Sequence, residues 1–359
     1  MNSLASSCAS QNAESVRTLR AALLGYLQKS QNADGGWSFY IAGDSRVEPT
    51  CWALRALAGP SESAQDHITR GIAFLKSLQL SDGSWPASNG MTSGGWVTSL
   101  AASVLARLPS QTSVQGPSVE KSVHAGLQWL SDDYPRDSTR WTKFLNNFQS
   151  SHASHNDEFR GWGWTPRTAS WVEPTAFALM AFASAAESFS AGPPGSPSEP
   201  GFRSQLPKSL AVKLEERRTL AIGFLYDRMC AGGGWNCGNP RVYGVDGDSL
   251  VLPTCWALLA LRGAPEHPNR QLSLAWLEKS FATIASPGSL ALAQITLESY
   301  GVPLPAHSRH LTDWSALDLA AQGTHVAAWA ALALSPARSW PEGARASHES
   351  SVTSHQSPQ

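Results

Sequence analysis

Two glutamates stand at positions suited to general acid chemistry. Glu48 and Glu173 each precede a Pro-Thr pair at the start of an apolar helical run. A glutamate that faces an apolar cavity has its pKa raised by desolvation, as a proton donor needs. A glutamate beside a helix N-terminus is instead stabilised as an anion. We name Glu48 and Glu173 as candidate catalytic residues; the simpler interpretation, in which they only charge the first turns of their helices, stays open.

Aromatic residues form a second candidate group. Trp52, Phe177, Trp256 and Trp329 each lie one or two turns into an apolar helical run. Aromatic walls suit a hydrophobic ligand, and the ring faces stabilise cations. The sequence therefore predicts that these four residues contact a ligand in a central cavity. The alternative is that they fill the core.

Metal ligation has weaker support. Asp248 precedes another apolar run and is a candidate ligand-binding residue, although residues 245–248 are first of all typical of a turn. Two His-x-x-His pairs, at 152–155 and 307–310, lie in polar segments typical of solvated loops. The five cysteines include no C-x-x-C pair. We predict neither a metal site nor a cofactor.

The elements that must position these residues form an internal repeat. One signature is a helix followed by Gln and an Asp-Gly-x-Trp turn, and it is complete in residues 31–37 and 79–85. Weaker copies contain Gly161-Trp162 and Gly234-Trp235. Self-similarity of this kind indicates a repeat architecture.

A second signature alternates with the first and begins a helix that is apolar almost all round. Clear copies surround Thr50, Thr175 and Thr254, weaker ones begin near Thr98 and Thr324, and a cryptic one spans 289–297. Helices apolar on every side must be buried on both faces, whereas the first set carries polar residues on one side. The sequence predicts an all-α fold, an α/α toroid of about six helical hairpins in two concentric rings.

One domain accommodates this repeat. We predict a single toroid over residues 16–335, with a Pro/Ser-rich insertion at about 188–212. Residues 1–15 are expected to form a flexible N-terminus and residues 336–359 a disordered tail, because neither segment carries a core-forming pattern.

The Asp-Gly-x-Trp turns resemble the QW repeat of squalene-hopene and oxidosqualene cyclases, which the β subunits of protein prenyltransferases share in looser form. The resemblance covers most of the chain and implies the toroid of the terpenoid cyclase and protein prenyltransferase superfamily. In this family the Gln and Trp brace adjacent outer helices. Triterpene cyclases carry two such barrels, and this chain resembles one.

The resemblance also bears on the chemistry. Through the shared Thr, the acid of the cyclase D-x-D-D-T or D-C-T motif corresponds to Glu48 and Glu173, with proline between acid and Thr. The zinc-binding Asp-x-Cys of prenyltransferases corresponds to Leu252 and Thr254, so that metal site is not expected. We expect a polyprenyl or triterpenoid-type (isoprenoid) ligand, with cyclase or prenyl-transfer activity as the associated hypothesis. The competing hypothesis is a non-catalytic toroid scaffold that binds a protein partner.

The composition limits the classes of partner that this protein is expected to bind. The net charge is -1 and only 15% of residues are charged, so no basic field attracts nucleic acid. No run of about 18 uncharged apolar residues predicts a membrane span. Without an apolar targeting segment near Met1, the sequence predicts a cytoplasmic protein.

Overall fold

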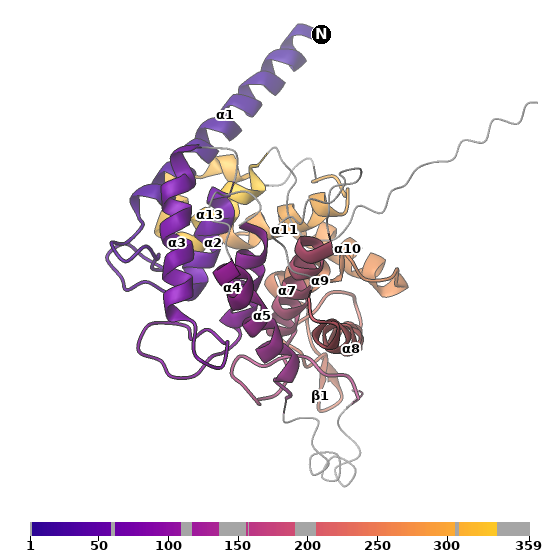
Figure 1. The fold of residues 1–359 in the computed structure, drawn as a ribbon. Helices are drawn as coiled ribbons and strands as arrows, with labels where there is room; N and C mark the ends of the chain where they lie inside the picture. The colour runs from indigo at the N-terminus through magenta and orange to yellow at the C-terminus, as the bar shows by residue number, and fades with distance from the viewer. Residues whose placement is uncertain are drawn as a thin grey trace, which may run out of the picture.

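The fold is described from a computed structural model, which covers residues 2–58, 62–108, 117–135, 156, 158–190, 206–305 and 309–335. The described residues are mostly helical (Figure 1). The inner helices are α2 (Val47–Leu57), α4 (Val97–Arg107), α7 (Val172–Ser190), α9 (Val251–Leu261), α11 (Pro287–Ser299) and α13 (Thr324–Ala333). The outer helices are α1 (Asn2–Lys29), α3 (Gln65–Leu78), α5 (Pro117–Asp132), α8 (Lys208–Asp227), α10 (Pro268–Phe281) and α12 (Ala316–Ala321).

The inner helices close into a ring. Helix α2 packs against α4, and α7, α9, α11 and α13 follow in turn, until α13 packs back against α2. The first and last units therefore lie side by side (Figure 1). Inner helices such as α4 and α9 are buried on nearly every side, as their uninterrupted apolar sequence requires.

Each outer helix precedes an inner helix in the chain and packs on the ring. In chain order the pairs are α1 with α2, α3 with α4, α5 with α7, α8 with α9, α10 with α11, and α12 with α13. In space, α3, α5, α8 and α10 pack mainly against the inner helix that precedes them in the chain. The prediction of an all-α toroid with two concentric rings and about six hairpins is confirmed. The cryptic fifth inner helix is α11, which begins at Pro287.

Four tryptophan turns join outer to inner helices by one repeated arrangement. The indole Nε1–H donates to a carbonyl near the end of the preceding outer helix at 2.5–3.0 Å. The backbone N–H of the same residue donates to a threonine Oγ1 in the first turn of the following inner helix at 2.9–3.0 Å. The pairs are Trp37 with Thr50, Trp85 with Thr98, Trp162 with Thr175, and Trp235 with Thr254. The turn thus fixes where each inner helix starts.

Helices reach into the segments that were expected to flank or interrupt the toroid. Helix α1 begins at Asn2, inside the range 1–15 assigned to a flexible terminus, and its N-terminal part projects beyond the other helices (Figure 1). Helix α7 continues to Ser190 and α8 starts at Lys208, so helices occupy both edges of the range 188–212. Residues 191–205 and the predicted tail 336–359 lie outside the described residues.

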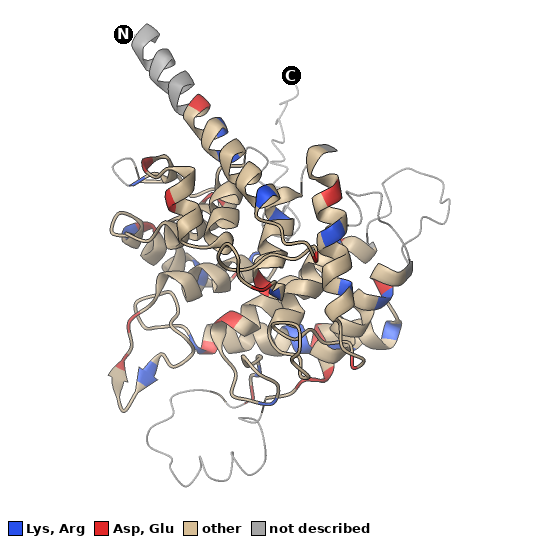
Figure 2. Cartoon of the chain, turned by 90° about the vertical axis from the view of Figure 1, so that its left-hand side faces the viewer, with Lys and Arg blue, Asp and Glu red and all other residues tan. Residues whose placement is uncertain are grey.

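Two smaller features complete the fold. Strands β1 (Arg241–Val242) and β2 (Val245–Asp246) form an antiparallel hairpin that projects from the toroid (Figure 2), and short 3-10 helices span Glu62–Ala64 and Leu311–Asp313. Basic and acidic residues are interspersed over the chain (Figure 2). Among the described residues, none of the helices combines the length and the apolar character needed to cross a bilayer.

Candidate active site at the toroid mouth

The first turns of the inner helices meet at one end of the ring, which we call the mouth. A backbone N–H at or next to the start of an inner helix donates to a carbonyl two residues past the tryptophan of a neighbouring turn. The pairs are Val47 to Ala87, Trp96 to Trp164, Val172 to Cys237, and Thr324 to Phe39, at 2.8–3.4 Å. The last of these pairs joins α13 to the first turn and closes the ring at the mouth.

Both candidate glutamates lie at the mouth and are partly buried. Glu48 is in the first turn of α2 and Glu173 in the first turn of α7, with α4 between these helices in the ring. Burial raises the pKa of Glu48 to about 7, a hydrogen bond from Trp52 Nε1 at 3.4 Å opposes the rise, and the charge of Glu173 adds to it. Burial also raises the pKa of Glu173. Desolvation therefore shifts the pKa of both carboxyl groups upward, toward the protonated form.

The four predicted aromatic residues come together one helical turn below the mouth, in what we call the aromatic cluster. Trp52 stacks on Trp256 with ring centroids 5.3 Å apart, Phe177 meets Trp256 edge-on at 5.0 Å, and Trp329 meets Trp52 at 5.8 Å. Their exposed fractions are only 1–7%. At this level the rings fill the centre of the toroid, as the core-filling interpretation expects, and ligand contact remains a prediction.

Two further residues lie at the mouth that the sequence did not single out as candidate site residues, although His325 falls within a residue of the zinc-binding His of the prenyltransferase pattern. Trp96 stacks on Phe177 at 5.2 Å, and His325 meets Trp329 edge-on at 5.0 Å. Burial lowers the pKa of His325. The signal was available, because His325 precedes Trp329 by four residues, as Glu48 precedes Trp52. Residues four apart lie on the same face of a helix. This spacing therefore marks the face of each inner helix that carries a mouth residue in its first turn and a residue of the aromatic cluster one turn later.

Asp248 is not joined to the glutamate pair. It is exposed in the segment between β2 and α9, and no hydrogen bond or ion pair of the described residues links it to Glu48 or Glu173. The neighbouring Asp246 forms an ion pair with Arg241 at 3.5 Å. Within the described part of the chain, no three His, Cys, Asp or Glu side chains are grouped to hold a metal. The histidine pair 152–155 lies outside the described residues.

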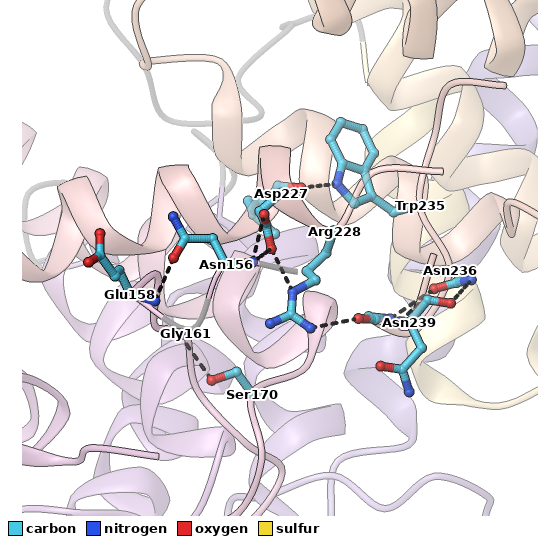
Figure 3. Close-up of polar contacts among 11 residues, drawn as sticks. Asn156, Glu158, Gly161, Ser170, Asp227, Arg228, Trp235, Asn236 and Asn239 are labelled. Carbon is cyan, nitrogen blue, oxygen red and sulfur yellow. Dashed lines mark hydrogen bonds and ion pairs between the residues drawn. The ribbon is translucent and has the colours of Figure 1, made fainter. Parts of the chain in front are cut away.

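An ion pair between a half-buried aspartate and a buried arginine lies at the end of α8 (Figure 3). Asp227 and Arg228 approach to 3.1 Å, and the Asp227 carboxylate accepts the backbone N–H of Asn156 at 3.1 Å. Arg228 also donates to the carbonyl of Gly238 at 3.4 Å. Gly238 follows Cys237, whose carbonyl accepts the N–H of Val172 at 3.2 Å. The pair therefore ties two neighbouring turns to the start of the helix that carries Glu173.

Two cavities lie away from the mouth. One of about 710 Å³ is lined by α7, α8 and α9, with Phe182, Leu214 and Ala260 in its walls. Another of about 610 Å³ is lined by Tyr26 of α1 and Leu317 of α12. Neither cavity touches the predicted site residues.

Comparison with known proteins agrees with the repeat. Residues 2–101 match the family model of the squalene-hopene cyclase C-terminal domain. None of the curated proteins matches the sequence. The matched range holds both complete Asp-Gly-x-Trp turns and Glu48.

Solved structures share the fold at low sequence identity. A protein from Actinoplanes is 16% identical, with a TM-score of 0.57 over 89% of this chain and 98% of that chain. A variant of the type II terpene cyclase MstE from Scytonema, in complex with its substrate geranylgeranyl dihydroxybenzoate, is 12% identical, with a TM-score of 0.52 over 92% of this chain and 82% of that chain. An inactive variant of an α-1,6-mannanase of Salegentibacter sp., bound to α-1,6-mannotriose, is 10% identical, with a TM-score of 0.55 over 90% and 99%.

Cyclases and glycosidases thus share this architecture, so the fold does not select the reaction. The cyclase-type sequence repeat is the more specific likeness. Residues 2–101 are thus similar to the squalene-hopene cyclase C-terminal domain, and the described toroid has the fold that type II terpene cyclases share.

Proposed function

We propose that this protein binds a polyprenyl or triterpenoid-type hydrocarbon at the mouth of the toroid and that Glu48 donates a proton to it. The observation that carries the proposal is the environment of Glu48. A pKa of about 7 keeps a substantial fraction of this carboxyl protonated at neutral pH, next to the rings of the aromatic cluster. A partly buried neutral acid beside an apolar, aromatic surface is suited to protonate an unsaturated hydrocarbon.

The proposed step balances without a cofactor. The Glu48 proton forms a C–H bond with one carbon of a double bond, the adjacent carbon becomes a cation, and Glu48 is left as a carboxylate. Aromatic rings stabilise such a cation through their quadrupole. Loss of a proton from another carbon of the ligand ends the step, and solvent reprotonates Glu48. Glu173 assists because its negative charge keeps the pKa of Glu48 high.

A non-catalytic scaffold is the second candidate, and the filled aromatic cluster favours it. A hydrocarbon of many carbons needs a cavity, and the cluster closes the centre of the toroid one turn below the mouth. Loops leading into α2 and α9 expose large apolar side chains, with Ile41 73% and Tyr243 82% exposed, as a protein-binding surface would. In this case the glutamates are structural.

Ligand capture and turnover distinguish the two candidates. We expect apolar compounds to copurify with the full chain, as detected by mass spectrometry, and added polyprenols to raise its melting temperature. Glu48→Gln should retain this thermal shift and abolish any conversion of the bound compound, because the amide cannot donate an equivalent proton. Asp248→Asn serves as the control, since Asp248 is exposed and apart from the pair. Absence of both copurifying lipid and a thermal shift contradicts the proposal and favours the scaffold.

A further inference from the structure

We infer that Arg217 of α8 positions Glu173, in the role that a glutamine plays in the first two tryptophan turns. This inference rests on the proposed function, since Glu173 belongs to the proposed site. Gln31 and Gln79 each precede the turn tryptophan by six residues, and the same place before Trp162 holds Asn156. In the third turn, a different residue must therefore link the turn to the neighbouring outer helix.

The glutamines show what the brace does. Gln31 Nε2 donates to the carbonyl of Gly35 in its own turn at 2.8 Å and to that of His67 in α3 at 2.9 Å. Gln79 Nε2 donates to Gly83 at 2.9 Å and to Ser122 in α5 at 2.8 Å. One amide thus clamps the turn to the next outer helix.

Arg217 makes the equivalent connection from the opposite side. Its Nη2 donates to the carbonyl of Gly161 in the third turn at 3.2 Å and to that of Asp133, just past α5, at 3.0 Å. Its guanidinium carbon lies 4.2 Å from the ring centroid of Trp162 and 4.5 Å from that of Tyr134. The residue is only 1% exposed, and burial lowers its pKa to about 10, which leaves it charged at neutral pH. Helix α8, the next outer helix, is therefore joined to the Trp162 turn through the side chain of Arg217.

The clamped turn leads directly to Glu173. Trp162 N–H donates to Thr175 Oγ1 at 3.0 Å, and Thr175 Oγ1 donates to the carbonyl of Trp171 at 2.6 Å. Glu173 lies between these two residues in the first turn of α7. Loosening the Trp162 turn would therefore release the helix turn that holds the carboxyl away from water.

The direction in which the pKa of Glu173 changes when Arg217 is replaced distinguishes two roles for Arg217: positioning the helix turn, or acting directly on Glu173 through its charge. Loss of a nearby cation raises the pKa of a carboxyl group, because the anion loses a favourable partner. Release of the first turn of α7 admits water to Glu173 and lowers its raised pKa toward the ordinary value. Arg217 as a positioning residue thus predicts a fall.

The test is a carboxyl-carbon NMR titration of the full, ligand-free chain labelled at glutamate, with Glu173→Gln used to assign the signal. In Arg217→Met we expect the pKa of Glu173 to fall. In Arg217→Lys, which keeps one donor but not the planar stack, we expect a smaller fall, and this variant carries the test if the methionine variant does not fold. Gln79→Met is the matched control, because it removes the corresponding side-chain hydrogen bonds from the turn that leads to α4. Trp96, directly before α4, stands there in place of a glutamate.

Three outcomes would overturn the inference: an unchanged pKa of Glu173 in a folded Arg217 variant, a rise of that pKa, or an equal fall in Gln79→Met. The titration needs no ligand, so its result is independent of ligand capture. A fall without any copurifying lipid would support the positioning role of Arg217 and contradict the proposed function. Copurification of lipid together with an unchanged pKa of Glu173 in the Arg217 variants would support the proposed function and contradict the positioning role of Arg217.

Discussion

At the scale of single residues, Glu48 is the group whose environment matters most. Its pKa rises from 4.5 to about 7 mainly because burial disfavours the carboxylate. The folded state therefore binds a proton that the unfolded state releases between these two values. Its stabilising contribution is present below pH 4.5 and is lost as pH rises through 7.

Glu48→Gln should remove this pH dependence. A shift from 4.5 to about 7 corresponds to about 3 kcal/mol. We expect the free energy of unfolding of the native protein to fall by that order between pH 4.5 and 7.5, and the variant to be the more stable protein above pH 7. Urea unfolding at several pH values measures the difference, with Glu278→Gln on the exposed face of α10 as control. Parallel pH profiles for Glu48→Gln and the native protein would show that Glu48 titrates as if exposed.

At the scale of elements, the tryptophan turns depend on glycine as much as on tryptophan. Gly83 has a φ of +92°, and a Cβ at this position would approach the carbonyl oxygen of Ala125 in α5 to 2.5 Å. Gly126, in the same outer helix, leaves room for the Trp85 ring, since a Cβ there would lie 2.7 Å from it. Each unit thus packs on the next through positions where a side chain does not fit.

Gly83→Ala should therefore be costly, whereas Gly25→Ala should not. The first change places a Cβ against the backbone of α5 in a left-handed conformation, and we expect a loss of about 2–4 kcal/mol. Gly25 lies within α1, and a Cβ added there would meet nothing within 4 Å, so alanine should stabilise by up to about 1 kcal/mol. Thermal and urea denaturation of both variants check this contrast. Similar stabilities would mean that the turn relaxes without disturbing α5.

At the scale of the whole molecule, the aromatic cluster joins parts of the ring that are distant in the chain. Its four residues come from α2, α7, α9 and α13, and α13 closes the ring against α2. Because each ring packs against residues from other units, unfolding of one hairpin exposes apolar surface of several others. The toroid is expected to unfold as one cooperative unit.

Trp256→Ala tests this coupling. Truncation of a nearly fully buried tryptophan leaves a cavity between the helices, and we expect a loss of about 3–5 kcal/mol. The transition should stay single and shift to lower urea when followed by both tryptophan fluorescence and circular dichroism. Trp171→Ala, at a position 37% exposed, provides the comparison and should lose much less. Separate transitions for the two probes would indicate that the units unfold independently.

The sequence by itself determined the repeat, the alternation of polar and apolar helices, and so the two rings, because helix periodicity and turn chemistry are local. Even the threonine and tryptophan of each turn are close in the chain. Only the tertiary structure decided that Glu48 and Glu173 meet at one mouth, that the aromatic cluster fills the centre, and that Arg217 braces a turn without its glutamine. These properties depend on which distant side chains exclude water from a given atom, and burial of that kind is set by closure of the whole ring.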